Sequence, residues 1–147
     1  KALPAESLTR LRRQWNVSDD ATRQYRKRAG TEVVAVRLDL DTDGFSYMKR
    51  GDMQRCKPGD WIVFDGDETY TIDADSFAAT YESAGQGLYR KTATVWARQA
   101  GRAGKIATRE GSTSYAAGDY LVSNDPGGDD SYAVSRERFE ATYEPVR

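Results

Sequence analysis

The chain contains no histidine, and this absence excludes more chemistry than any other feature of its composition. Histidine is the side chain that most often acts as a general base, a proton shuttle or a metal ligand near neutral pH. Ser-His-Asp catalysis and zinc chemistry are therefore excluded. The single cysteine, Cys56, cannot form an internal disulfide, which fits a reducing compartment.

Long hydrophobic runs are also missing. No segment approaches the roughly 20 apolar residues of a membrane-spanning helix, and none resembles the hydrophobic part of a signal peptide. Hydrophobic residues make up 38% of the 147 residues and charged residues 31%. We therefore expect a cytoplasmic protein with a thin core and no membrane contact, in which the nine tyrosines supply much of the buried area.

Basic residues are concentrated at the N-terminus. Residues 1–30 carry a net charge of +5, which leaves −6 for the rest of the chain. Leu8, Leu11 and Trp15 recur at helical spacing, so the sequence predicts an amphipathic helical arm over residues 1–24. The arm is a candidate docking site for an acidic protein partner, whereas the acidic remainder disfavours nucleic acid.

One hexapeptide occurs twice, since FAATYE at residues 77–82 returns as FEATYE at residues 139–144. Four further pairs of short matches precede the two copies in the same order. The pairs are YRK (25–27) with YRK (89–91), AVR (35–37) with WAR (96–98), PGDWIVF (58–64) with AGDYLVS (117–123), and TYTI (69–72) with SYAV (131–134). Ordered matches of this kind indicate an internal duplication.

Each copy has the patterns of β-strands. Residues 33–40 alternate as a half-buried strand does, and the runs WIVF and YLVS each follow a Gly-Asp turn. ETYTI and SYAV follow turn-rich segments and complete hairpins, while DADS and SRER are typical of single helical turns. The sequence thus predicts a mainly β (α+β) fold, with two tandem pseudo-repeats of a small antiparallel sheet or half-barrel at residues 25–84 and 89–147.

The motifs YRK, PGDW and FAATYE carry a resemblance to a known group of proteins. The chain resembles a loosely defined set of small bacterial and phage proteins, one group of which takes its name from a PGDYG motif. The second copy, with Ala117 in place of the proline, departs from that pattern. The resemblance implies the fold described above in two tandem copies, and it implies no reaction.

Two acidic motifs were considered as metal or catalytic sites. Asp39, Asp41 and Asp43 match the first ligand positions of an EF-hand loop, but Arg50 stands where the bidentate glutamate is needed. An acidic turn is therefore the favoured interpretation, and we expect no metal and no cofactor. Asp60 and its counterpart Asp119 are explained by turn chemistry.

Arginines that recur in both copies are the candidate ligand-binding residues. Arg26 and Arg90 belong to the YRK motifs, and Arg37 and Arg98 lie in apolar strands. One interpretation is a solvated strand face or ion pairs with acidic residues. The other is an anion site in which these guanidinium groups hold a nucleotide or another phosphate-bearing molecule while Trp96 stacks on it.

Three classes of function remain open. The predicted class is a non-catalytic binding or sensory module within a larger protein, which recognises a small anionic, nucleotide-like ligand at the seam between the repeats. The first alternative is a protein-interaction or structural module of bacterial or phage origin. The second is a hydrolase with paired carboxylates, for which Asp60 with Asp65 or Asp67 are the candidates.

Overall fold

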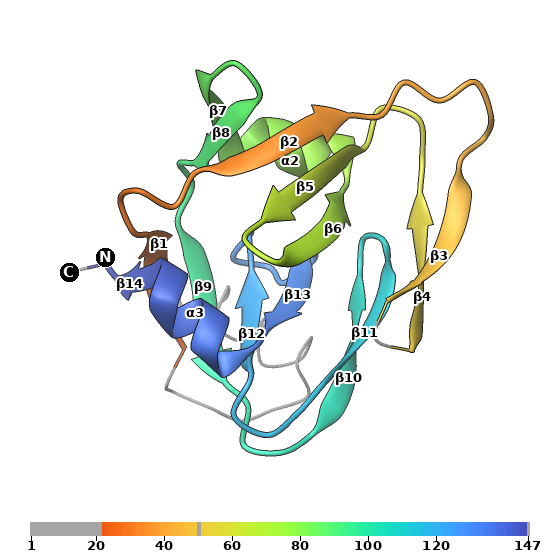
Figure 1. The fold of residues 1–147 in the computed structure, drawn as a ribbon. Helices are drawn as coiled ribbons and strands as arrows, with labels where there is room; N and C mark the ends of the chain where they lie inside the picture. The colour runs from red at the N-terminus through yellow and green to blue at the C-terminus, as the bar shows by residue number, and fades with distance from the viewer. Residues whose placement is uncertain (1–21, 50, 147) are drawn as a thin grey trace.

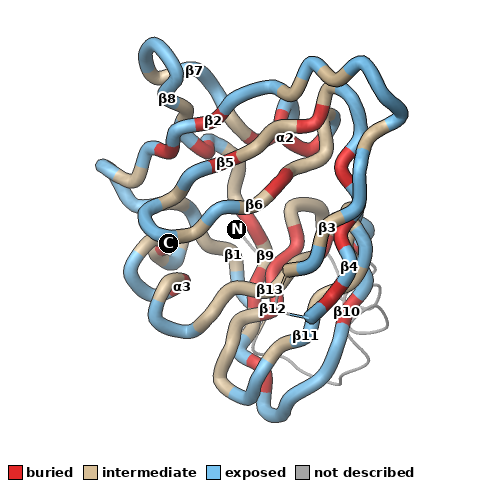
Figure 2. The backbone as a smooth tube through the Cα atoms, turned by 45° about the vertical axis from the view of Figure 1, so that its right-hand side comes forward, coloured by how far each residue is buried: buried red, intermediate tan, exposed pale blue. Residues whose placement is uncertain are grey.

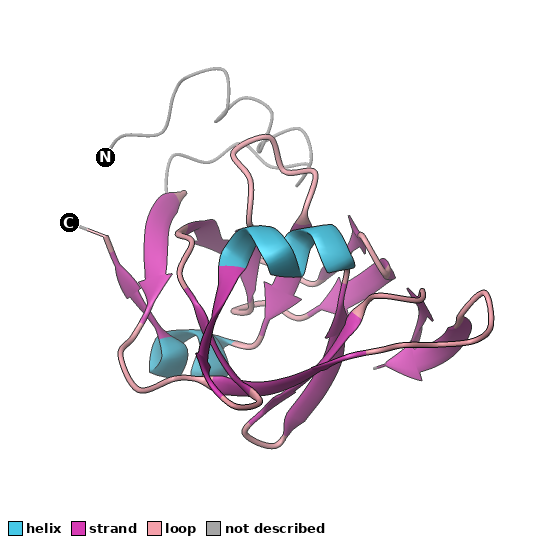
Figure 3. Ribbon diagram, turned by 90° about the horizontal axis from the view of Figure 1, so that it is seen from above, coloured by secondary structure: helices cyan, strands magenta, loops and turns pink. Residues whose placement is uncertain are grey.

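A computed structural model describes residues 22–49 and 51–146 of the chain. Antiparallel strands dominate this part and form three sheets, with two short helices set among them (Figures 1 and 3). The mainly β prediction is therefore confirmed. The predicted helical arm falls largely on residues 1–21, which lie outside the described residues. No helix in the described part of the chain is long and apolar enough to cross a membrane.

Two of the sheets have five strands each. The first has the order β6 (Glu68–Ile72), β5 (Trp61–Asp65), β2 (Val33–Arg37), β8 (Leu88–Lys91) and β7 (Tyr81–Gly85). The second has the order β13 (Ser131–Val134), β12 (Tyr120–Ser123), β9 (Val95–Gln99), β1 (Arg23–Lys27) and β14 (Tyr143–Pro145). The strands at the two ends of the described chain, β1 and β14, lie side by side (Figure 1).

The third sheet joins two hairpins. Its order is β10 (Gly104–Thr108), β11 (Gly111–Tyr115), β4 (Asp52–Cys56) and β3 (Phe45–Lys49). The strand pairing between the hairpins has one pair of partner residues, Gly111 opposite Gln54. Here Gly111 has a φ of 151°, and a Cβ atom on it would lie 2.3 Å from the Met53 carbonyl oxygen, so the close approach of the two backbones requires glycine.

The predicted division into one sheet for each half of the chain is wrong, because there are three sheets and each contains strands from both halves. β1 comes from the first half but pairs with β9 and β14 of the second. β8 comes from the second half but pairs with β2 and β7 of the first. Local strand patterns do not specify the sheet that a strand joins, so the sequence could not predict this exchange.

The two helices end on the repeated hexapeptides. α2 (Ala74–Thr80) begins after the N-cap Asp73, whose side chain accepts hydrogen bonds from the Asp75 and Ser76 amides. α3 (Arg136–Thr142) begins after the N-cap Ser135 in the same way. The tyrosine that follows each helix is extended and opens a strand, so each FxATYE motif forms a helix-to-strand corner.

Aromatic rings from these corners fill the core of each five-stranded sheet. Phe77 stacks between Trp61 and Tyr81, with ring centroids 4.0 and 4.6 Å away, and Tyr89 meets it edge-on. Phe139 is packed likewise by a second set of rings, contributed by Tyr120, Tyr143 and Tyr25. Buried positions recur along the strands, with exposed positions between them (Figure 2).

Candidate functional site

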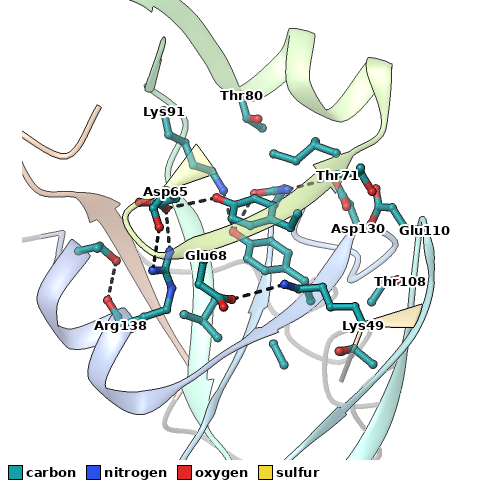
Figure 4. Close-up of a pocket in the computed structure, with 18 of the residues that line it drawn as sticks. Lys49, Asp65, Glu68, Thr71, Thr80, Lys91, Thr108, Glu110, Asp130 and Arg138 are labelled. Atoms are coloured by element: carbon teal, nitrogen blue, oxygen red, sulfur yellow. Dashed lines mark hydrogen bonds and ion pairs between the residues drawn. The ribbon is translucent and has the colours of Figure 1, made fainter. Parts of the chain in front are cut away.

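A cavity of about 160 Å³ lies where the three sheets meet. Strands of all three sheets and helix α3 supply its wall (Figure 4). The charged and tyrosine side chains of the wall are Lys27, Lys49, Lys91, Arg138, Asp65, Glu68, Glu110, Asp130, Tyr47, Tyr70, Tyr81, Tyr132 and Tyr143. Pockets on which a few polar groups converge are common binding sites.

Lys91, the last residue of β8, is the most deeply placed cation of this wall. The residue is 7% exposed. Its Nζ donates to the Tyr132 hydroxyl at 2.6 Å and to the Tyr143 hydroxyl at 3.4 Å, and it lies 5.0 to 5.9 Å from the ring centres of Tyr81, Tyr132 and Tyr143. Within the described residues, its hydrogen-bond partners are therefore neutral phenols.

Lys91 changes between its charged and its neutral form near neutral pH. Burial is the main reason why the pKa of Lys91 is lowered to about 7, the nearby charge of Lys27 also lowers it, and Asp130 acts in the opposite direction. Burial raises the pKa of Tyr143 to about 12 and that of Tyr132 well above its usual value. The phenols thus stay neutral, and Lys91 is the group that gains or loses a proton.

Lys27 has a different surrounding, because a carboxylate lies beside it. Its Nζ is 3.5 Å from Asp65 Oδ2, and that oxygen also lies 2.8 Å from the guanidinium of Arg138. The Tyr70 hydroxyl donates to the same oxygen at 3.3 Å. Burial lowers the pKa of Lys27, while Asp65 opposes this effect. Lys27, Asp65 and Arg138 therefore form a closed ionic cluster, and Figure 4 shows Asp65 beside Arg138.

The acidic groups on the opposite wall are also engaged. Asp130 accepts hydrogen bonds from Ser76 Oγ at 2.6 Å and Asn124 Nδ2 at 3.1 Å. Glu110 accepts from the Asp73 amide at 2.9 Å, and burial raises the pKa of Glu110 to about 7. Glu110 is thus only partly ionised at neutral pH, so it neutralises only part of the positive charge in the cavity.

Strand alternation explains why the lysine of each YRK motif points inward. Tyr89 packs on Phe77 in the core, and because successive side chains of a strand face opposite sides, Lys91 shares its face and Arg90 does not. In β1, Tyr25 packs on Phe139 in the same way. The repeated lysines rather than the repeated arginines therefore enter the cavity.

The five residues predicted to bind a ligand lie elsewhere, and none of these described residues lines the cavity. Arg26 forms an ion pair with Glu144 at 2.8 Å, and Arg90 lies 3.2 Å from Glu82. Trp96 is half-buried on β9, where it packs on a hydrophobic cluster. The predicted residues are thus not gathered at this site.

Arg37 and Arg98 also differ from each other in register. Arg37 lies opposite Trp61, at the start of β5. Arg98 lies opposite Leu121, and the partner of Tyr120, which follows the second Gly-Asp turn, is Gln99. The alignment of AVR with WAR is therefore one residue out of register, and a shift by one residue reverses the face of a strand on which a side chain lies.

The carboxylates considered for hydrolysis do not form a pair. Asp60 is 1% exposed and accepts hydrogen bonds from the amides of Lys57 and Ala74, so it holds the turn before β5. Asp65 ends the same strand, about 16 Å away at roughly 3.3 Å per residue. Asp67 lies in the turn between β5 and β6. These separations do not suit acid and base acting on one bond.

The acidic loop at Asp39, Asp41 and Asp43 is exposed between β2 and β3. Across residues 22–49 and 51–146, no group of three or more histidine, cysteine or carboxylate side chains is placed to hold a metal ion.

Comparison with protein-family models, curated proteins and solved structures finds no match to this chain. The resemblance to PGDYG-motif proteins therefore stays a prediction.

Proposed function

We propose that the protein is a non-catalytic binding module whose central cavity holds a small anionic ligand, with Lys91 as the main recognition group. The observation that carries this proposal is the burial of Lys91 among neutral phenols. A buried charge whose hydrogen-bond partners are all neutral is costly, and Asp130 offsets that cost only through its more distant charge. A carboxylate or phosphate bound in the cavity would supply that opposite charge.

The size of the cavity favours a small ligand. At about 160 Å³, it lies below the usual range of sites for drug-sized molecules. This suits an organic acid or a single phosphate group better than a whole nucleotide, which the sequence had suggested. Tyrosine rings in the wall offer flat apolar faces to the rest of the ligand.

We also infer that the two halves of the chain are duplicated copies that exchange a strand. The strand order of the second sheet follows from that of the first when each element is replaced by its counterpart in the other half, β8 and β1 included. Lys27 and Lys91 are then equivalent, as are Tyr70 and Tyr132. The cavity lies at the seam of the two copies on this interpretation.

One difference between the copies supports an anion site beside Lys91. Asp65 and Asn124 each lie four residues after the aromatic residue of a Gly-Asp-aromatic turn, Trp61 or Tyr120. The Tyr70 hydroxyl donates to Asp65, and the Tyr132 hydroxyl donates to Asn124 Oδ1 at 3.4 Å. Asp65 thus neutralises Lys27, whereas an amide stands at the matching place near Lys91. The second copy has no negative charge at the position of Asn124, and an anionic ligand would supply one there.

A thermal-shift titration with inorganic phosphate, acetate, lactate and nucleotides tests the proposal. We expect at least one anion to raise the melting temperature of the wild-type protein. Lys91→Met removes the cation and Asn124→Asp supplies an internal carboxylate, so both variants should lose the response. Arg37→Ala is the matched control, because Arg37 is exposed and outside the cavity. The proposal would be contradicted if no anion raised the melting temperature of the wild type, or if Lys91→Met gave the same rise as the wild type.

The protein-interaction alternative is favoured by a separate observation, the apolar outer face of the first sheet. Val34 lies opposite both Phe64 and Leu88, and the three residues are 40% to 45% exposed. Neighbouring exposed apolar side chains are typical of contact surfaces. A Phe64→Ser variant separates the two functions, since it should keep the anion response and lose any contact made through this face.

A further inference from the structure

We propose that Lys91 captures a small carbonyl-bearing acid, such as a 2-oxo acid, as a covalent imine inside the cavity. This inference rests on the proposed anion site and deepens it. The geometry that supports it is a buried primary amine in the wall of the cavity, held at its tip by the hydroxyls of Tyr132 and Tyr143. A phenol hydroxyl within 2.6 Å of Nζ is placed to move a proton during reaction at that nitrogen.

Lys91 differs from the other lysines of the cavity. Lys27 lies beside Asp65 at 3.5 Å, and Lys49 donates to the Thr69 carbonyl at 2.8 Å and pairs with Glu68 at 3.7 Å. Carboxylate neighbours keep an amine protonated and unreactive. Among these three described lysines, Lys91 is the one whose hydrogen-bond partners are hydroxyls.

The protonation state of Lys91 is the second support. Burial and the charge of Lys27 lower the pKa of Lys91 to about 7, so about half of the molecules carry a free amine at neutral pH. An exposed lysine with a pKa near 10.4 is unprotonated in roughly one molecule in 2,500 at pH 7. A desolvated lysine beside a second cation is a known form of amine nucleophile toward carbonyl groups.

The reaction balances without an oxidant or a further reactant. The Nζ lone pair forms a bond to the carbonyl carbon while the C=O π pair moves to oxygen. A proton passes from nitrogen to that oxygen through the Tyr132 hydroxyl, which gives a carbinolamine. The C–O bond then breaks, the second N–H proton leaves with the oxygen as water, and the C=N bond forms. Amine and carbonyl thus become imine and water.

The cavity also provides for the acid group of such a ligand. Lys27 adds positive charge close enough to lower the pKa of Lys91, and Asn124 offers an amide where the other half has a carboxylate. An anion held there would lie beside the amine and orient its carbonyl carbon toward Nζ. Binding by charge would therefore precede the covalent step and raise the effective concentration of the carbonyl group.

Reductive trapping tests the inference. The full chain is incubated with pyruvate and sodium cyanoborohydride at pH 7, and intact mass and peptide mapping locate the product. We expect one adduct at Lys91. Its added mass should equal that of pyruvic acid less one water plus two hydrogens, because the imine forms with loss of water and is then reduced. Labelling should fall at least about tenfold in Lys91→Met, and also in Asn124→Asp, where a carboxylate keeps the amine protonated. Lys105→Arg is the control, because it removes an exposed amine and retains the ion pair with Asp52.

Two further probes separate this inference from the anion site. Lactate has no ketone or aldehyde group to form an imine, so a lactate-induced thermal shift without pyruvate trapping would overturn the imine and leave anion binding intact. Propanal has no charge, so trapping of propanal at Lys91 without any lactate shift would support the reactive amine and contradict the anion site. Equal labelling of the wild type and of Lys91→Met would overturn the inference.

Discussion

The cost of burying Lys91 is the main energetic feature at the scale of single residues. Burial lowers its pKa from 10.5 to about 7 in the folded chain, so between these values the unfolded chain binds a proton that the folded chain does not. The free energy of unfolding should therefore rise with pH from about 7 to 10.5. Below about pH 7 both states hold the proton, and the full cost of the buried charge remains.

Replacement of this lysine should consequently stabilise the protein. Lys91→Met removes a buried charge and keeps most of the side-chain volume, so we expect the free energy of unfolding at pH 6 to rise by about 1 to 3 kcal/mol. The increase with pH above 7 should disappear. Urea titrations from pH 6 to pH 10 measure both effects, with the exposed Arg102→Met as control. A lower free energy of unfolding for Lys91→Met at pH 6 would show that Lys91 stabilises the fold, which would contradict a role in ligand binding alone.

The lysines of the two YRK motifs recur in the sequence, but the predicted ligand-binding residues were the arginines beside them. The alternation of side chains along a strand was the missed signal. Tyr25 and Tyr89 are large aromatics that need burial, so Lys27 and Lys91, two residues further on, share the inner face. Charge alone favours arginine as an anion ligand, whereas register decides which side chain reaches the cavity.

At the scale of elements, the aromatic stacks explain why nearly the same hexapeptide occurs twice in the sequence. Phe77 is 3% exposed and Phe139 is 1% exposed, and each stacks on the tyrosine of its own motif and on the aromatic residue that begins β5 or β12. The phenylalanine and the tyrosine of each motif are four residues apart, a spacing that puts both rings on one face of a helical turn. The structure confirms this, although each tyrosine begins a strand instead of continuing the helix.

Removal of one of these rings should be costly. Phe77→Ala or Phe139→Ala leaves a cavity in a stack, so each should lower the free energy of unfolding by about 3 to 5 kcal/mol. Phe64→Ala is the matched control, because its ring is 42% exposed, and it should cost less than about 1 kcal/mol. Chemical denaturation of the three variants checks this. Equal small losses at all three positions would mean that the motif does not hold the core together.

The hairpins of the third sheet were not predicted, for a physical reason. β4 does alternate, but two of its three buried side chains are polar, Asp52 and Gln54. Asp52 accepts from the Ser114 amide, and Gln54 donates to the Ser112 carbonyl, so partners in β11 satisfy them. A pattern of polar residues facing inward carries no hydrophobic signal, and such a strand cannot be found without its partner.

At the scale of the whole molecule, the exchange of β1 and β8 ties the halves together. Each exchanged strand sits between two strands of the other half, and each brings a tyrosine to the opposite aromatic stack, Tyr25 to Phe139 and Tyr89 to Phe77. The short sequence matches, which occur in the same order in both halves, predicted two copies. They could not predict the exchange, because pairing within a half and pairing between halves have the same local pattern.

This arrangement predicts that neither half folds alone. A chain cut in the turn between Gln86 and Gly87, after β7 and before β8, yields a first half without β8 and a second half without β1. Each half would then expose strand edges and an incomplete aromatic stack. Circular dichroism should show that both fragments are unfolded when they are separate.

Mixed in equal amounts, the two fragments should form a 1:1 complex that unfolds in one cooperative transition and binds the same anion as the intact chain. As the control, the mixture with Phe139→Ala in the second fragment should associate more weakly. Cooperative unfolding of either fragment by itself would show that the exchanged strands are not needed, and that each half is an independent domain.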